Sequence, residues 1–148
     1  MKPNPRRLDL SIYPHRFQIA TRFSDVDPQW HLNNVRLMEY YQEARVLFHD
    51  ALKNEFDIAK VDGARTLVVH MSVDYLDEVH YPGEVTLGVG VLRIGTTSYS
   101  LGLGLFQNDH CAGVAMAVLV HADKSGVAPL PEAWREVLQK NLLPEAAR

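Results

Sequence analysis

A short segment near the start of the chain concentrates polar side chains that can do chemistry: Asp25, Asp27, His31, Asn33 and Asn34. An ionised carboxylate can attack a carbonyl carbon, or it can activate water as a general base. An asparagine side chain can accept hydrogen bonds from the free N–H groups at the start of a helix. These residue types therefore favour a site in which a carboxylate lies beside a helix N-terminus.

The residues that follow predict a long amphipathic helix from about Val35 to Leu52. Their apolar members recur at helical spacing and form one broad stripe: Leu37, Tyr41, Ala44, Phe48 and Leu52. Asn33 or Asn34 is suited to cap the first turn. The free N–H groups of that turn, and the positive end of the helix dipole, would stabilise a negatively charged oxygen.

Alternation of apolar and other residues predicts five strands, one before the helix and four after it. They cover residues 15–23, 66–76, 84–94, 98–106 and 111–121. In the second strand, the alternation places one set of side chains on a common face: Leu67, Val69, Met71, Val73 and Tyr75. The last strand is apolar on both faces, which indicates cover from both sides. A final short helix is expected from about Pro131 to Lys140.

This order of elements predicts an α+β fold, in which a curved five-stranded antiparallel sheet wraps around the long helix. The links between the last four strands are short, so these strands are expected to form a meander. Glycines within the strands permit strong curvature or a close approach of backbone. We expect a single domain over residues 1–148, with residues 1–14 as an extended N-terminal arm.

Length, composition and charge limit which kinds of protein and which binding partners the chain suits. The chain has 148 residues, of which 47% are hydrophobic, and a net charge of −3, so it suits one folded domain without wholesale nucleic-acid binding. Its one cysteine excludes an internal disulfide framework. No export leader and no membrane-spanning run is recognisable, which predicts a cytoplasmic location. The histidines lack metal-ligand spacing, so neither a metal nor a cofactor is expected.

The segment "RFSDVDPQWHLNNVRLMEYYQEAR" resembles the signature of hotdog-fold acyl-CoA thioesterases of the 4-hydroxybenzoyl-CoA thioesterase type. The matching positions are two aspartates, the histidine and asparagines, and an aromatic-rich helix that carries Glu43, Ala44 and Arg45. The resemblance implies a hotdog domain that hydrolyses acyl-CoA as a homodimer or homotetramer. It assigns catalysis to Asp27, as nucleophile or general base, and substrate positioning to His31, Asn33 and Asn34.

The chain departs from this signature at Trp30, where the family usually has glycine. Glycine adopts a positive φ at little cost and tryptophan does not, so we expect the loop to take another path. Trp30 and Tyr41 are candidates for the acyl pocket, although burial in the core is the simpler interpretation of Tyr41. By the same resemblance, Arg93, Thr97 and Ser98, near the turn "RIGTTS", are candidates for binding CoA.

Two alternative functions stay open on the same fold. A hydratase or dehydratase acting on acyl thioesters would depend on His80, in the segment "HYPGE", rather than on Asp27. That segment lacks the further proline and glycine of the longer dehydratase motif, and it falls where a turn is expected. A non-catalytic protein that binds acyl-CoA or lipid would keep the cavity without turnover.

Overall fold

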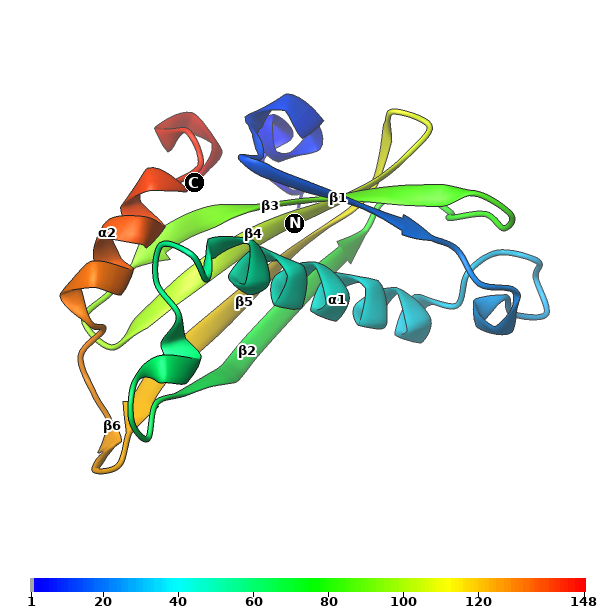
Figure 1. The fold of residues 1–148 in the computed structure, drawn as a ribbon. Coiled ribbons are helices and arrows are strands. Elements are labelled where there is room, and N and C mark those ends of the chain that lie inside the picture. Colours follow the sequence, from blue (N-terminus) through cyan, green and yellow to red (C-terminus); the bar gives the residue numbers. More distant parts are fainter. Residues whose placement is uncertain (1) are drawn as a thin grey trace.

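The computed structural model describes residues 2–148 and confirms the predicted curved antiparallel sheet around one long helix (Figure 1). The strand order is β1-β3-β4-β5-β2, and a short β6 pairs with β5. The strands span His15–Ala20 (β1), Arg65–Tyr75 (β2), Glu84–Ile94 (β3), Ser98–Gln107 (β4), His110–Asp123 (β5) and Gly126–Val127 (β6). β1 and β2 therefore form the two edges of the main sheet.

The predicted long helix is α1, Asn34–Leu52, and it lies across one face of the sheet (Figure 1). Its expected apolar stripe is buried and packs in the main hydrophobic core with inward-facing residues of β3, β4 and β5. A second helix, α2 (Glu132–Lys140), confirms the expected C-terminal helix and adds Trp134 and Leu138 to the same core. None of the helices in residues 2–148 is long and apolar enough to cross a membrane.

The face predicted for β2 is wrong in its first half because the strand contains a bulge. The pairing with β5 shifts register between Val68 and His70. An extra residue in one strand reverses the facing of every residue before it. Thr66 and Val68 therefore share the helix side of the sheet with Met71 and Val73, in place of the expected Leu67 and Val69.

The outer face of the sheet is covered by both ends of the chain. Residues 5–12 are not extended as expected but form two 3-10 turns, Pro5–Leu8 and Leu10–Ile12, capped by the side chains of Asn4 and Asp9. This arm packs directly on strand glycines. A Cβ at Gly88 would lie 2.5 Å from the Tyr13 ring, so the close approach at this glycine is made by a side chain.

Candidate active site

The loop between β1 and α1 is held in place by Asp25, whose carboxyl group is 3% exposed. Asp25 accepts hydrogen bonds from the Tyr40 hydroxyl at 2.7 Å and from Arg22 Nε at 2.9 Å. Burial raises the pKa of Asp25, but these two donors outweigh it, so the pKa lies below its ordinary value. Asp25 thus ties the loop to α1 as an ionised structural residue.

The turn that carries Asp27 is closed by three hydrogen bonds. The Trp30 N–H donates to Asp27 O at 3.0 Å, and the Asp27 N–H donates to His31 O at 3.0 Å. The Gln29 N–H donates to Asp27 Oδ1 at 2.9 Å. Oδ2 of Asp27 is therefore the carboxylate oxygen that this turn leaves available.

The expectation that Trp30 redirects this loop is wrong. Trp30 adopts a φ of 68°, so the chain keeps the left-handed conformation that favours glycine. That conformation costs a residue with a Cβ roughly 1–2 kcal/mol. The turn hydrogen bonds of Asp27 and Trp30 hold the strained residue in place.

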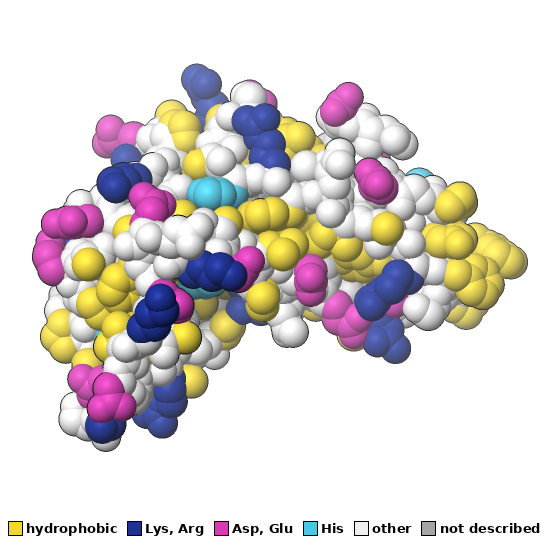
Figure 2. All heavy atoms as spheres, viewed as in Figure 1, with side chains coloured by type: hydrophobic (Ala, Val, Ile, Leu, Met, Phe, Trp, Pro, Cys, Tyr) yellow, Lys and Arg dark blue, Asp and Glu magenta, His cyan; other side chains and the backbone are white. Residues whose placement is uncertain are grey.

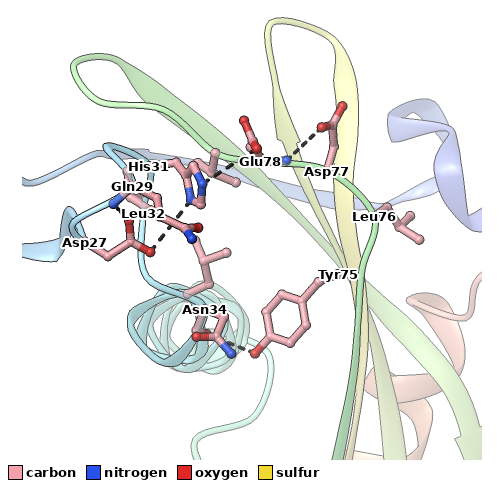
Figure 3. Close-up of a pocket in the computed structure, with 11 residues that line it drawn as sticks. Asp27, Gln29, His31, Leu32, Asn34, Tyr75, Leu76, Asp77 and Glu78 are labelled. Carbon is pink, nitrogen blue, oxygen red and sulfur yellow. Dashed lines mark hydrogen bonds and ion pairs between the residues drawn. The ribbon is translucent and has the colours of Figure 1, made fainter.

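The start of α1 is capped as expected. Asn33 is the N-cap residue, and its side-chain oxygen accepts from the Val35 N–H at 2.8 Å. The other N–H groups of a first helical turn have no partner within the helix. The Tyr75 hydroxyl donates to Asn34 O at 2.9 Å, so the end of β2 also holds this turn (Figure 3).

Asp27 and the start of α1 open onto one cavity of about 380 Å³, which we call the Asp27 cavity. One wall comes from the loop and helix and includes Asp27, His31 and Asn34. The opposite wall is the end of β2 with the segment that follows it, and it includes Tyr75, Asp77 and Glu78. A backbone hydrogen bond joins the two walls, because the Leu32 N–H donates to Val79 O at 2.8 Å.

His31 lies between two carboxylates (Figure 3). Its Nδ1 is 3.8 Å from Asp27 Oδ2, and its Nε2 is 3.6 Å from Glu78 Oε1. Both distances are too long for direct hydrogen bonds, so the ring can orient either carboxylate through electrostatic attraction or a bridging molecule. The arrangement offers an attacking oxygen, a group that orients it, and a helix start that can hold negative charge.

The structure does not bring every predicted site residue to this cavity. Trp30 is 75% exposed, and Phe23 is exposed as well. Figure 2 shows that apolar side chains gather at the surface at one end of the molecule. Tyr41 is fully buried in the core, where burial raises the pKa of its hydroxyl. Neither side chain lines the Asp27 cavity within one chain.

The candidates for CoA binding lie at the other end of the sheet. Tyr75, at the cavity, is level with Leu87 of β3 through the successive pairs with Gly113 and Leu105, and Arg93 lies six residues further along β3. At about 3.3 Å per residue, this corresponds to roughly 20 Å along the strand. Thr97 and Ser98 follow in the next turn and strand. Within a single chain, these residues do not reach the Asp27 cavity.

The second wall of the Asp27 cavity contains residues that sequence reasoning did not assign to the site. Tyr75 was predicted only as a strand residue, and Asp77 and Glu78 were not predicted at all. They come more than forty residues after Asp27 and carry no local motif. His80 was predicted to lie next to a turn between strands, and it is exposed in the connection between β2 and β3. No group of three or more metal-ligating side chains suited to a metal ion occurs within residues 2–148.

Similar proteins of known structure share this architecture. A thioesterase complexed with coenzyme A and Zn from Thermus thermophilus is 30% identical, with a TM-score of 0.75 over 87% of this chain and 95% of that chain. The PA5185 protein from Pseudomonas aeruginosa strain PAO1 is 27% identical, with a TM-score of 0.77 over 90% of this chain and 94% of that chain.

A predicted thioesterase from Bacillus stearothermophilus, at 23% identity, has a TM-score of 0.76 over 87% of this chain and 97% of that chain, which shows the fold alone. No functionally curated protein matches the sequence at a significant level. Residues 21–142 match the family model described as the thioesterase-like superfamily. The chain therefore belongs to the thioesterase-like superfamily, and it is a thioester hydrolase with the hotdog fold.

Proposed function

We propose that the protein hydrolyses acyl-CoA to a free acid and the CoA thiol, with Asp27 as the catalytic carboxylate. Either Asp27 Oδ2 attacks the thioester carbonyl, or it removes a proton from the water that attacks. The thiolate that leaves has a low proton affinity, about pKa 8.5 for a simple thiol, so a strong general acid is not required. One carboxylate and one oxyanion site are then sufficient.

The first turn of α1 supplies the oxyanion site in this proposal. Its free N–H groups and the positive end of the helix dipole face the charge that develops on the carbonyl oxygen. Asn33 shapes this site by capping Val35, while Asn34 lines the cavity. His31 orients Asp27 from its position between Asp27 and Glu78. The observation that carries the proposal is that a carboxylate and a helix start share one cavity.

We further propose that the active protein is a homodimer formed by the edge strand β2. An unpaired edge of apolar strand residues favours pairing with another chain, and Leu67, Val68 and Val69 are exposed on this one. A two-fold axis pairs β2 with its copy in antiparallel fashion. Arg65 and Ser98 lie at the same end of the sheet, since both pair near the end of β5. In this dimer, the β3–β4 turn of the partner subunit therefore lies at the same end of the joined sheet as the Asp27 cavity.

This assembly gives the distant CoA candidates a role. Arg93, Thr97 and Ser98 of the partner subunit would contact the phosphates and pantetheine of a CoA whose thioester lies in the Asp27 cavity. A cationic side chain is needed there, because Asp77 and Glu78 make the wall of the cavity itself acidic.

Release of free thiol from short, long and aromatic acyl-CoAs tests the proposed reaction directly. We expect turnover with at least one class, and equal turnover for the His80→Ala variant. Loss of double-bond absorbance from enoyl-CoA without thiol release, abolished in His80→Ala, would instead identify a hydratase. Binding of acyl-CoA with no turnover of any thioester would identify a binding protein.

A further inference from the structure

A second cavity, of about 270 Å³, lies between the C-terminal half of α1 and the start of β2. We call it the Arg45 cavity. Its polar members are Arg45, His49 and Thr66, and its walls include Val46, Val68 and Leu119. Apolar walls with a few polar groups are typical of sites for small organic ligands.

The guanidinium group of Arg45 has no partner in this cavity. Its Nε is fully buried without a hydrogen bond, and none of the hydrogen bonds or ion pairs among residues 2–148 uses its other nitrogens. Burial lowers the pKa of Arg45, which reflects the cost of keeping the charge out of water. Buried polar groups are almost always satisfied, so the buried Nε–H of this half-buried side chain calls for an acceptor from outside the chain.

The neighbouring histidine does not provide that acceptor. His49 Nδ1 lies 2.7 Å from Arg45 O, which can only accept, so Nδ1 carries the proton. Nε2 then accepts from the Tyr99 hydroxyl at 2.6 Å. Both ring nitrogens are therefore occupied, and burial lowers the pKa of His49, which keeps the ring neutral. The cavity thus holds a single unbalanced positive charge.

Two-fold pairing of β2 brings this cavity to the active site of the other subunit. The Arg45 cavity lies at the start of β2, at Thr66 and Val68, and the Asp27 cavity lies at its end, at Tyr75. When a strand pairs with its own copy, the start of one faces the end of the other. Full overlap of Arg65–Tyr75 places Tyr75 opposite Arg65 of the partner subunit, across a strand spacing of about 4.8 Å.

We propose that Arg45 of the partner subunit binds a carboxylate at the far end of the acyl group whose thioester lies beside Asp27. The inference rests on the proposed thioesterase function and names its substrate class, the ω-carboxyacyl-CoAs. A guanidinium matches a carboxylate with paired hydrogen bonds and balances one negative charge. The Thr66 hydroxyl can donate a further bond, and the apolar walls accommodate the methylene groups.

Matched substrates test this selectivity. We expect kcat/KM for glutaryl-CoA to exceed that for pentanoyl-CoA about tenfold or more, since a site built for a polar group disfavours the analogue that lacks it. Arg45→Met should reduce the ratio to near one, and Arg45→Lys should retain part of it. Arg6→Met, at an exposed arginine of the N-terminal arm, should leave the ratio unchanged. No preference in the natural protein, or a preference that survives Arg45→Met, would overturn the proposal.

A mixed dimer tests the origin of Arg45. An Asp27→Asn chain and an Arg45→Met chain, co-expressed with different tags and isolated as a pair, retain one site with both intact residues only if Arg45 acts across the interface. We expect the preference for glutaryl-CoA to return in this pair. Activity without the preference would place Arg45 and Asp27 in the same subunit's site and contradict the proposal.

Binding can be measured without turnover, which separates this inference from the proposed function. Failure to release thiol from any acyl-CoA would reject the thioesterase proposal alone. The Arg45 Nε–Hε NMR signal, assigned by its absence in Arg45→Met, should shift with monomethyl glutarate and not with methyl pentanoate. An unmoved signal would reject the carboxylate site.

Arg45→Met should also melt at an equal or higher temperature than the natural protein. A lower melting temperature would indicate that Arg45 pairs with a carboxylate of the partner chain, which contradicts the proposal.

Discussion

At the scale of single residues, Asp25 and Asp27 show how surroundings divide two nearby carboxylates between structure and chemistry. Asp25 is buried, and its Oδ2 accepts hydrogen bonds from both Arg22 and Tyr40. Asp27 uses one oxygen in its own turn and presents the other to a cavity. The resemblance already assigned catalysis to Asp27, and the hydrogen-bond partners supply a physical reason why Asp25 is structural.

Asp25→Asn should destabilise the protein by about 2 kcal/mol, because it weakens charge-assisted hydrogen bonds that hold the loop. The folded-state pKa of Asp25 lies below its ordinary value, so the ionised carboxyl stabilises the fold above about pH 3.9, the ordinary pKa. This contribution is lost as pH falls through the lower, folded-state pKa. Urea unfolding at pH 7, 5 and 3.5 should give equal differences at the first two values and a smaller one at the third. A difference that grows on acidification would contradict this role.

Trp30→Gly should raise the free energy of unfolding by about 1 kcal/mol, because it relieves the positive φ at little loss of packing. Trp30→Ala keeps the strain and serves as the control, so it should show no comparable gain. Thermal and urea unfolding of the three proteins measure the effect. A glycine variant less stable than the natural protein would mean that the indole makes contacts in the assembled protein that outweigh the strain.

At the scale of elements, the start of α1 combines two tasks in the proposed mechanism, since Asn33, which caps the helix, would also shape the proposed oxyanion site. Asn33→Asp separates them. An aspartate caps as well as asparagine, so stability should stay within about 0.5 kcal/mol. Its negative charge beside the first-turn N–H groups opposes the developing oxyanion, so thiol release should slow about tenfold or more.

Asn33→Ala provides the comparison, because it removes the cap without adding charge and should cost about 1 kcal/mol of stability. Unfolding and steady-state thiol release are measured on both variants. An Asn33→Asp protein with an unchanged rate would remove the start of α1 from the oxyanion site.

Periodicity predicted the long helix, its cap, the five main strands and the short last helix, because each depends on local sequence. The bulge in β2 was not predictable in the same way, because it is defined by the pairing of Val68 and His70 with β5. The loop wall of the Asp27 cavity lies in one contiguous motif and was found. Tyr75 and Glu78 reach the cavity only through the sheet topology, and nothing in their local sequence marks them.

At the scale of the whole molecule, the sheet has two different faces and two different edges. The outer face is sealed by the chain's own ends, through Tyr13, Leu143 and Arg7 against strand glycines. The edge strand β2 instead exposes apolar side chains next to both cavities. The exposed apolar edge of the sheet at β2 is therefore where the proposed second copy would bind and complete the site at the Asp27 cavity.

Light scattering at micromolar concentration should give at least the mass of a dimer. Val69→Lys places a charge on the exposed bulge residue of β2, close to the expected two-fold axis, where two lysines would repel each other. We expect this variant to shift toward monomer and to lose activity in proportion. Val127→Lys, at an exposed apolar position on β6, is the control and should leave the mass unchanged. A fully active monomer would contradict the shared site.

The most direct test of the whole account is the rate of thiol release by Asp27→Asn. Asn keeps the shape of the side chain and can still accept the Gln29 hydrogen bond, so the fold should be retained. Losing a catalytic base typically costs about 10²–10⁴ in rate, and we expect a loss at least that large in kcat, with an unchanged melting temperature. Asp109→Asn, the same substitution in the β4–β5 turn, should retain full activity. A folded Asp27→Asn protein that hydrolyses acyl-CoA at the natural rate would contradict the catalytic role of Asp27.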